Sequence, residues 1–166
     1  MSDIRIRRAA VADLPAVWPI FRTIVRAGDT YAYPRDCTRA DARRIWLDAP
    51  RETWLAEADD AMLGTYYIKT NQGGGGAHVC NCGYMVAADA RGQGVAAAMC
   101  AHSQQRALEL GYLAMQFNFV VATNEGAIRL WKRIGFDVVG RLPRAFAHPE
   151  AGLVDALVMY KWLADI

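Results

Sequence analysis

The segment from Val86 to Ala96, VAADARGQGVA, constrains this chain more than any other part of it. An apolar run ends there in a turn that carries two glycines, and an alanine-rich helix is predicted to begin directly after it. The free N–H groups of the first helical turn and the positive end of the helix dipole then point at whatever occupies the turn. Such a junction favours a bound phosphate group.

The composition is typical of one folded domain, which we expect to span residues 1–166. Hydrophobic residues make up 54% of the chain and charged residues 22%, which is enough apolar material for a core. The formal net charge is only +2 and the arginines are scattered. This balance does not indicate a nucleic-acid partner.

Nothing at the N-terminus resembles a signal peptide, and no apolar run approaches the roughly 20 residues that a membrane span needs. We therefore expect a cytoplasmic protein with no membrane partner.

The four cysteines, Cys37, Cys80, Cys82 and Cys100, are expected to be reduced and packed in the interior. The Cys80-x-Cys82 pair has the wrong spacing for a zinc knuckle, and its side chains would lie on one face of a strand. We therefore predict no metal site. The alternative is that Cys80 or Cys82 carries an acyl group as a nucleophile, but no clear histidine–carboxylate pair accompanies them.

The periodicity of apolar residues predicts a β-α-α-β-β-β-α-β-α-β-β order. Helices are expected from Asp13 to Gly28, from Thr38 onward, over 94–111 and over 124–134. Strands are expected over 3–9, 53–58, 62–70, 78–86, 113–121, 136–142 and 153–163, with a flexible connection at 71–76 and a loop at 143–152. The order indicates an α/β (α+β) fold with a mixed central sheet of about seven strands and helices on both faces.

A second motif lies at residues 124–136, NEGAIRLWKRIGF, and with the first it resembles the GCN5-related N-acetyltransferase (GNAT) family. Arg91, Gly94 and Ala96 fill the family's pyrophosphate loop, Arg/Gln-x-x-Gly-x-Gly/Ala. The second family motif is matched by Asn124, Ala127, Ile128, Leu130, Lys132, Gly135 and Phe136. One position departs, because Trp131 stands where the family usually has a tyrosine.

The resemblance implies the GNAT fold and acetyl-CoA as cosubstrate. In that fold the strands at 78–86 and 113–121 run parallel and then splay apart, and the pantetheine arm enters the gap. Main-chain groups of Tyr84 and Val86 would pair with this arm, and an N–H near Tyr84 would face the thioester oxygen. Asn124 would help to hold the cofactor, or cap the helix that follows it. The pyrophosphate would lie on the turn formed by Arg91, Gly92, Gln93, Gly94, Val95, Ala96 and Ala97.

The proton chemistry departs from the family pattern. Indole can donate a hydrogen bond but is not an acid at neutral pH, so Trp131 cannot replace the tyrosine that protonates the departing thiolate. Tyr84, Tyr160 and solvent remain as substitutes. No carboxylate stands in the 78–86 strand, where many relatives keep a glutamate base, so a water-mediated base, capture of the neutral amine or titration of His78 would serve instead.

Two asparagines, Asn81 and Asn118, stand in apolar strands that flank the expected gap. A buried amide left unpaired costs about 1–3 kcal/mol, so each needs a partner. The partner is either a substrate carboxylate or amine, or the local main chain where the strands separate.

A narrower resemblance favours the substrate. Residues 64–69 (GTYYIK), 78–81 (HVCN) and 117–118 (FN) look like the fungal acetyltransferases that detoxify azetidine-2-carboxylate. By that resemblance, Asn81 and Asn118 lie at the acceptor site. The Tyr31/Tyr33 loop lies where the family builds its acceptor wall, whereas Tyr66 and Tyr67 are expected to be ordinary strand residues.

We therefore expect an acetyl-CoA-dependent N-acetyltransferase whose partner is a small amine, with a proline-like cyclic amino acid such as azetidine-2-carboxylate as the first choice. The amine would attack directly in a ternary complex, with Asn81, Asn118 and Tyr84 at the reacting centre. The alternatives are acetylation of a protein N-terminus or lysine, and a non-catalytic sensor of acyl-CoA. A homodimer is expected by analogy with the family.

Overall fold

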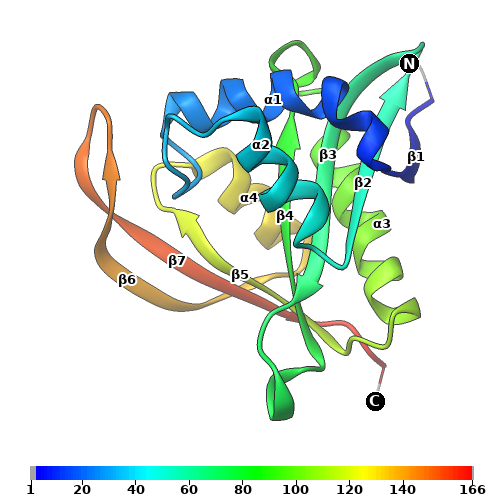
Figure 1. The fold of residues 1–166 in the computed structure, drawn as a ribbon. Coiled ribbons are helices and arrows are strands. Elements are labelled where there is room, and N and C mark those ends of the chain that lie inside the picture. Colours follow the sequence, from blue (N-terminus) through cyan, green and yellow to red (C-terminus); the bar gives the residue numbers. More distant parts are fainter. Residues whose placement is uncertain (1–2, 166) are drawn as a thin grey trace.

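The computed structural model describes residues 3–165, so residues 1, 2 and 166 of the expected domain lie outside the described part. Seven strands form one sheet (Figure 1). They are β1 (Arg5–Arg8), β2 (Glu52–Ala58), β3 (Ala61–Thr70), β4 (Val79–Val86), β5 (Ala114–Val121), β6 (Asp137–His148) and β7 (Gly152–Trp162).

The strands lie in the order β1-β2-β3-β4-β5-β7-β6. Neighbours pair antiparallel except for β4 and β5, which are parallel. A parallel pair needs a crossover between its strands, and helix α3 (Val95–Glu109) supplies it. The mixed sheet and the order of elements predicted from the sequence are confirmed.

Helices cover both faces of the sheet (Figure 1). On one face lie α1 (Leu14–Ala27) and the short α2 (Arg39–Ala42), and on the other lie α3 and α4 (Glu125–Ile134). The helix predicted from Thr38 onward begins with a capping box formed by Thr38 and Asp41, and it continues after Ala42 as a wider π-helical turn over Arg43–Asp48.

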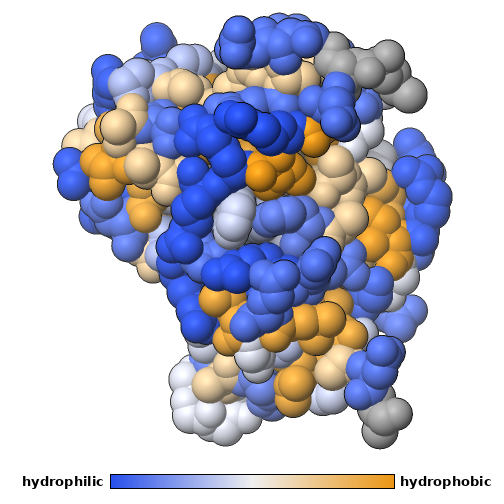
Figure 2. All heavy atoms as spheres, turned by 90° about the vertical axis from the view of Figure 1, so that its right-hand side faces the viewer, coloured by the Kyte–Doolittle hydropathy of each residue, from blue (hydrophilic) through white to orange (hydrophobic). Residues whose placement is uncertain are grey.

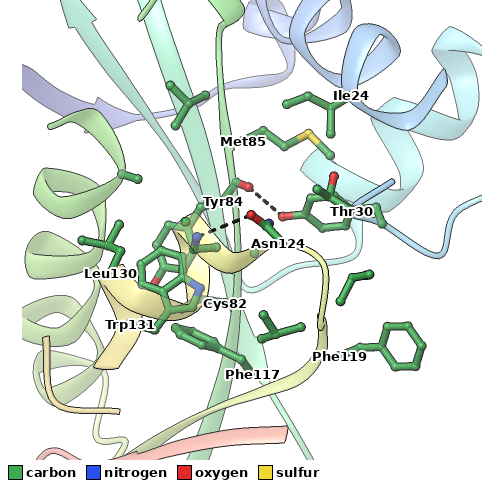
Figure 3. Close-up of a pocket in the computed structure, with 18 of the residues that line it drawn as sticks. Ile24, Thr30, Cys82, Tyr84, Met85, Phe117, Phe119, Asn124, Leu130 and Trp131 are labelled. Carbon is green, nitrogen blue, oxygen red and sulfur yellow. Dashed lines mark hydrogen bonds between the residues drawn. The ribbon is translucent and has the colours of Figure 1, made fainter. Parts of the chain in front are cut away.

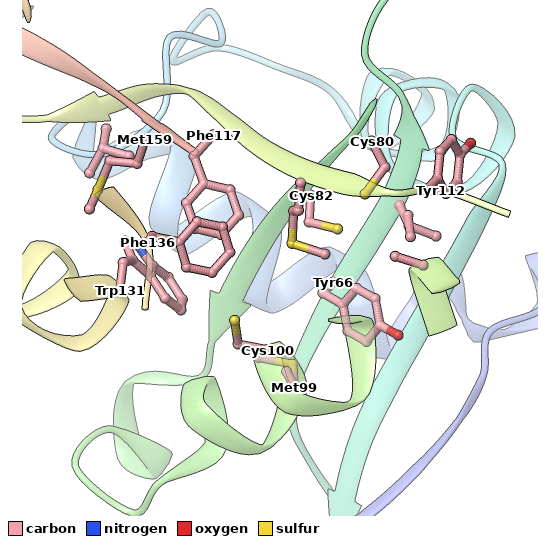
Figure 4. Packing of buried hydrophobic residues seen from close by; sticks show 14 of the residues in the cluster. Tyr66, Cys80, Cys82, Met99, Cys100, Tyr112, Phe117, Trp131, Phe136 and Met159 are labelled. Atoms are coloured by element: carbon pink, nitrogen blue, oxygen red, sulfur yellow. The ribbon is translucent and has the colours of Figure 1, made fainter. Parts of the chain in front are cut away.

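Two apolar clusters hold these layers together. The first packs α1 onto the sheet through side chains that include Phe21, Trp46 and Tyr67. The second lies between the sheet and α3 and α4 (Figure 4), and it contains Cys82 and Phe117. Side chains alternate across a strand, so Tyr67 and its neighbour Tyr66 belong to different clusters.

Strands β4 and β5 separate soon after they meet. They are paired only where Val79–Asn81 face residues 114–116. Beyond Phe117 the pairing of β5 with β7 is irregular up to Val120, so β5 turns away from β4 toward β7. The expected gap between these two strands is therefore present at the middle of the sheet.

The prediction of a loop over residues 143–152 is wrong. Residues 143–152 were predicted to be irregular because Pro143 and Gly152 suggest turns, yet β6 continues to His148 and pairs with β7 as far as Gly152. The strand accommodates Pro143 and the left-handed Arg144 (φ 52°) in an irregularity between Leu142 and Phe146. The resulting hairpin projects from the rest of the molecule (Figure 1).

The face on the side of β1 and α3 is mostly hydrophilic, with separate apolar patches (Figure 2). Its charges are largely paired, as when Glu52 binds both Arg8 and Arg106 at 2.7 and 2.8 Å. No described helix combines the length and the apolar character that crossing a bilayer requires.

Candidate active site

A cavity of about 1090 Å³ lies where β4 and β5 diverge. Its walls come from the loop after α1, from β4 and β5, and from the first turns of α3 and α4. In Figure 3, Leu130, Trp131 and Phe117 lie on one side of it, and Ile24, Thr30 and Met85 lie on the other. The cavity therefore joins the predicted phosphate turn to the predicted acceptor residues.

The turn predicted to bind phosphate lies at one end of the cavity. Gly92 and Gly94 have φ angles of +75° and +81°, which residues with a side chain rarely adopt. No atom lies within 4 Å of the position that a Cβ would take at either glycine. No side chain caps the N-terminus of α3, so its first N–H groups remain available to an anion. The turn residues that line the cavity are Arg91, Gly92, Gly94, Val95, Ala96 and Ala97.

Gln93 alone among the predicted turn residues does not line the cavity. Its side-chain nitrogen donates instead to the main-chain oxygen of Asp89 at 2.8 Å, which closes the turn from outside. Its part in the site is structural support for the turn.

The main chain of β4 offers hydrogen-bonding groups to the gap. Val79 and Ala87 bond through their main chains toward β3. Because N–H and C=O groups alternate along a strand, those of Cys82, Tyr84 and Val86 point the other way, toward the space that β5 has left. An extended chain such as a pantetheine arm can pair there.

One of these groups already has a partner. The Tyr31 hydroxyl donates to the Tyr84 carbonyl at 2.8 Å (Figure 3). Both residues line the cavity, so the bond links two parts of its wall. It fixes the loop after α1 against β4. The Tyr84 N–H lies on the same edge and suits the oxyanion role predicted for it.

The Tyr84 side chain points away from the acceptor residues, into the α3 side of the sheet. Its hydroxyl lies 2.7 Å from Ser103 Oγ, and Ser103 itself donates to the Cys100 carbonyl, so Tyr84 donates to Ser103. Burial raises the pKa of this phenol well above its usual value of 10. A phenol held in this way is a poor acid, which argues against the Tyr84 side chain as the substitute for the family's tyrosine.

Trp131 lies beside Tyr84 and Phe117, with ring centroids 5.1 and 5.2 Å apart. Trp131 is buried, with only 7% of the residue exposed. Within the described residues, the indole Nε1 of Trp131 makes no hydrogen bond. Every fully buried polar side-chain atom there does make a hydrogen bond, so Nε1 is not fully buried. The indole N–H is therefore open to the cavity, which Trp131 lines.

Asn81 is buried and lines the cavity where the strands part. Its Nδ2 donates to the Gln116 carbonyl at 2.9 Å, and its Oδ1 accepts from the Tyr67 hydroxyl at 3.1 Å. An amide nitrogen carries two hydrogens and its oxygen two lone pairs, so each atom keeps one bond for a ligand. The amide thus has two partners within the protein, the Gln116 main chain and the Tyr67 side chain, and can still bind a ligand as well.

Asn118 also lines the cavity, but it is exposed, not buried in an apolar strand. Its Nδ2 donates to Asn71 Oδ1 at 2.7 Å, and its Oδ1 accepts from Gln116 Nε2 at 2.9 Å. The irregular pairing of β5 turns this residue outward. Solvent and neighbouring amides therefore remove the buried-amide penalty that singled it out.

Tyrosines line the part of the cavity where the acceptor is predicted to bind. Tyr31 and Tyr33 stack at 5.4 Å, and both line the cavity as predicted. Tyr67 also lines it and bonds to Asn81, so the expectation that it is an ordinary strand residue is wrong. Its cross-strand partner is Gly83, where a Cβ would lie 2.6 Å from the Tyr67 ring.

Asn124 caps α4, because its Oδ1 accepts from the Ala127 N–H at 3.4 Å. It lines the cavity as well, and its Nδ2 makes no hydrogen bond within the described residues. One residue can therefore fill both predicted roles.

The cysteines are all free and buried. Burial raises the pKa of Cys82, which lines the cavity, and raises that of Cys100 to about 11. Neutral thiols are poor nucleophiles, which argues against the acyl-carrying alternative. Among the described residues no group of three or more His, Cys, Asp or Glu side chains could hold a metal ion.

Two of the expected candidates for proton transfer lie outside the cavity. His78 packs against Trp162, and neither His78 nor Tyr160 lines the cavity. Of the described residues that do, Asp29 carries the only carboxylate and His148 the only imidazole. His148 Nδ1 accepts from the N–H groups of Glu150 and Ala151 at 3.1 Å, which assigns the proton of the neutral ring to Nε2.

Comparisons with known proteins agree with this geometry. The profile of the acetyltransferase (GNAT) family matches residues 17–136. The chain belongs to the GNAT family of acetyltransferases. It is therefore an N-acetyltransferase that takes its acetyl group from acetyl-CoA.

Two individual relatives are also named as N-acetyltransferases. A GNAT structure from Kribbella flavida is 43% identical, covers 96% of this chain and 98% of its own, and superposes with a TM-score of 0.91. The N-acetyltransferase aca1 of Schizosaccharomyces pombe is 29% identical over 151 residues, which are 81% of this chain and 72% of the relative.

A phosphinothricin acetyltransferase from Sinorhizobium meliloti in complex with acetyl-CoA shares the fold. Its TM-score is 0.87 at 20% identity, over 99% of this chain and 90% of that one.

Proposed function

We propose that this GNAT enzyme acetylates the nitrogen of a small amino compound, and that its acceptor is a cyclic secondary amino acid related to proline or azetidine-2-carboxylate. The observation that carries the proposal is the continuity of the cavity. One cavity runs from the free N–H groups of α3 to the asparagines and tyrosines of the acceptor wall.

The cofactor would lie along this path. The turn at Gly92 and Gly94 and the first N–H groups of α3 would bind the pyrophosphate. The outward main-chain groups of Tyr84 and Val86 would pair with the pantetheine arm, and the Tyr84 N–H would stabilise charge on the thioester oxygen. Removing one such donor from an acyl-transfer site costs about 10²–10³ in rate.

The acceptor would enter from the tyrosine side. Asn81 and Asn118 each keep one donor and one acceptor after their bonds within the protein, and these would orient the amine. The neutral amine would then attack directly in a ternary complex, without an acyl-enzyme. The stacked Tyr31 and Tyr33 rings suit a small apolar ring.

Release of free CoA thiol from acetyl-CoA tests the proposal with a panel of amines: azetidine-2-carboxylate, proline, ordinary amino acids, polyamines and a lysine peptide. Turnover confined to the cyclic amino acids is the expected result. Turnover on the peptide alone would support the protein-acetylation alternative. Acetyl-CoA binding without turnover of any amine would support the sensor.

We also propose that residues 1–166 form one catalytic domain that works in the cytoplasm as a homodimer. All four thiols are unpaired, which suits a reducing compartment. Strand β6 lies at the edge of the sheet, and the hairpin it forms with β7 exposes 59% of Val139 and 64% of Leu153. Light scattering coupled to gel filtration should give twice the mass of the chain, whereas a monomer mass would contradict the dimer.

A further inference from the structure

Lys69 carries a positive charge that the roles assigned above do not use. It lines the cavity, and within the described residues no carboxylate pairs with it. Its Nζ lies 5.1 Å from the centroid of the Tyr67 ring, a cation–π distance. Tyr67 in turn donates to Asn81. The ammonium group is therefore held beside the acceptor wall and remains free to bind an anion.

The register of the sheet places Lys69 at the acceptor residues. Lys69 on β3 is the direct cross-strand partner of Asn81 on β4, and directly paired residues project from the same face. Asn81 is also the last residue of β4 that pairs with β5. Lys69 thus stands at the point where the gap opens, on the face that α1 covers.

The other cations that line the cavity have different origins. Arg91 belongs to the phosphate turn, and Arg129 and Arg133 come from α4. Arg129 is paired with Glu125 at 3.4 Å. Lys69 is the lining cation that comes from the sheet itself, next to the residues proposed to orient the amine.

We infer that Lys69 binds the carboxylate of the acceptor and so restricts the enzyme to amino acids with a free α-carboxylate. The inference rests on the proposed function, because it names a substrate determinant of the same site. An α-amino acid has its carboxylate one carbon away from its amine, so a carboxylate on Lys69 would place the nitrogen close to Asn81. An amine without a carboxylate would lack this contact.

The test compares azetidine-2-carboxylate with its carboxamide as acceptors for the wild type and for Lys69→Met, Lys69→Arg and Arg22→Gln. The two Lys69 variants separate loss of charge from loss of shape. Arg22 lies on the exposed face of α1, outside the residues that line the cavity, and Arg22→Gln removes one positive charge elsewhere.

For Lys69→Met we expect kcat/KM for the acid to fall about 10- to 100-fold, mostly through KM, because hydrogen bonds to charged groups are the strong ones. The kcat/KM for the carboxamide and the KM for acetyl-CoA should not change. Lys69→Arg should retain most activity on the acid, and Arg22→Gln should behave as the wild type.

Equal losses on acid and carboxamide, or no loss on either, would overturn the role of Lys69 while leaving the proposed function intact. If the wild type acetylates the carboxamide or a plain amine but no amino acid, both the role of Lys69 and the proposed function are wrong. Calorimetric titration of the acid into the protein with CoA gives a readout without turnover. Weaker binding to Lys69→Met than to Lys69→Arg is expected, and equal binding would count against the inference.

Discussion

The side-chain amide of Asn81 donates to the main-chain carbonyl of Gln116 at 2.9 Å. These two residues form the last pair of the parallel β4–β5 ladder. Where a ladder ends inside a protein, the next carbonyl loses its partner, and here a side chain supplies the missing donor. The bond thus ties the two strands together at the point where they begin to separate.

Replacing Asn81 should therefore cost stability as well as activity. Asn81→Ala leaves the Gln116 carbonyl and the Tyr67 hydroxyl without their partner, and we expect the free energy of unfolding in urea to fall by about 1–3 kcal/mol. Asn118→Ala is the matched comparison, because Asn118 is exposed, and its effect on stability should stay within about 0.5 kcal/mol. Equal stabilities for the two variants would contradict the role of Asn81 at the end of the ladder.

The phosphate turn should depend on Gly94 through its backbone. Gly94→Ala forces a side chain into a left-handed conformation, at about 1–2 kcal/mol, and a rearranged turn should raise the KM for acetyl-CoA. Gly75→Ala serves as the control, since φ there is not positive and nothing lies within 4 Å. Isothermal titration with CoA measures the effect, and unchanged affinity in Gly94→Ala would argue against the turn as the binding site.

Trp131 should act as a hydrogen-bond donor toward the departing thiolate. Trp131→Phe keeps a ring beside Tyr84 but removes the N–H, and we expect kcat to fall about tenfold, as for loss of a bond to a charged group. Trp131→Tyr restores a donor that can also lose its proton. We expect it to recover activity and to show a new decline of kcat at alkaline pH. Identical pH profiles for the Tyr and Phe variants would contradict this role.

Acid should destabilise the β1–β2–α3 side through Glu52. Hydrogen bonds from Arg106, which outweigh desolvation, lower the pKa of Glu52 below its usual 4.5. A carboxylate whose pKa is lowered by folding contributes its full stabilisation at any pH above its pKa in the unfolded chain. This stabilisation is lost as the pH falls through the pKa of the carboxylate in the folded chain.

The melting temperature of the wild type should therefore drop below about pH 4.5 more steeply than that of Glu52→Gln. Each 1 kcal/mol lost should lower it by about 2–4 °C. Glu125→Gln is the control, because the Glu125–Arg129 pair is largely exposed. Parallel curves for Glu52→Gln and the wild type would contradict the assignment.

Much of this molecule can be predicted from its sequence because local signals coincide with the tertiary structure. The two glycines at 92 and 94 and the alanine-rich run after them predict the turn and the start of the helix, and both glycines have positive φ in the structure. Asn124 is both a helix cap and a cavity residue, so its local pattern marks the right position.

The acceptor side is harder to predict, because it depends on register. Tyr67 and Lys69 become cavity residues only because β3 pairs with β4 so that Lys69 faces Asn81. Asn118 is turned outward by an irregularity in β5, and Pro143 is tolerated because distant β7 continues the pairing. The alternating pattern of a strand carries no signal for either event.

The absent side chain of Gly83 has a consequence for the shape of the cavity. A Cβ there would lie 2.6 Å from the Tyr67 ring, so the ring, which lines the cavity, would have to move. A displaced ring would also weaken the hydrogen bond from the Tyr67 hydroxyl to Asn81. The missing side chain at Gly83 thus makes room for the Tyr67 ring in the cavity wall, and one added carbon is enough to disturb that wall.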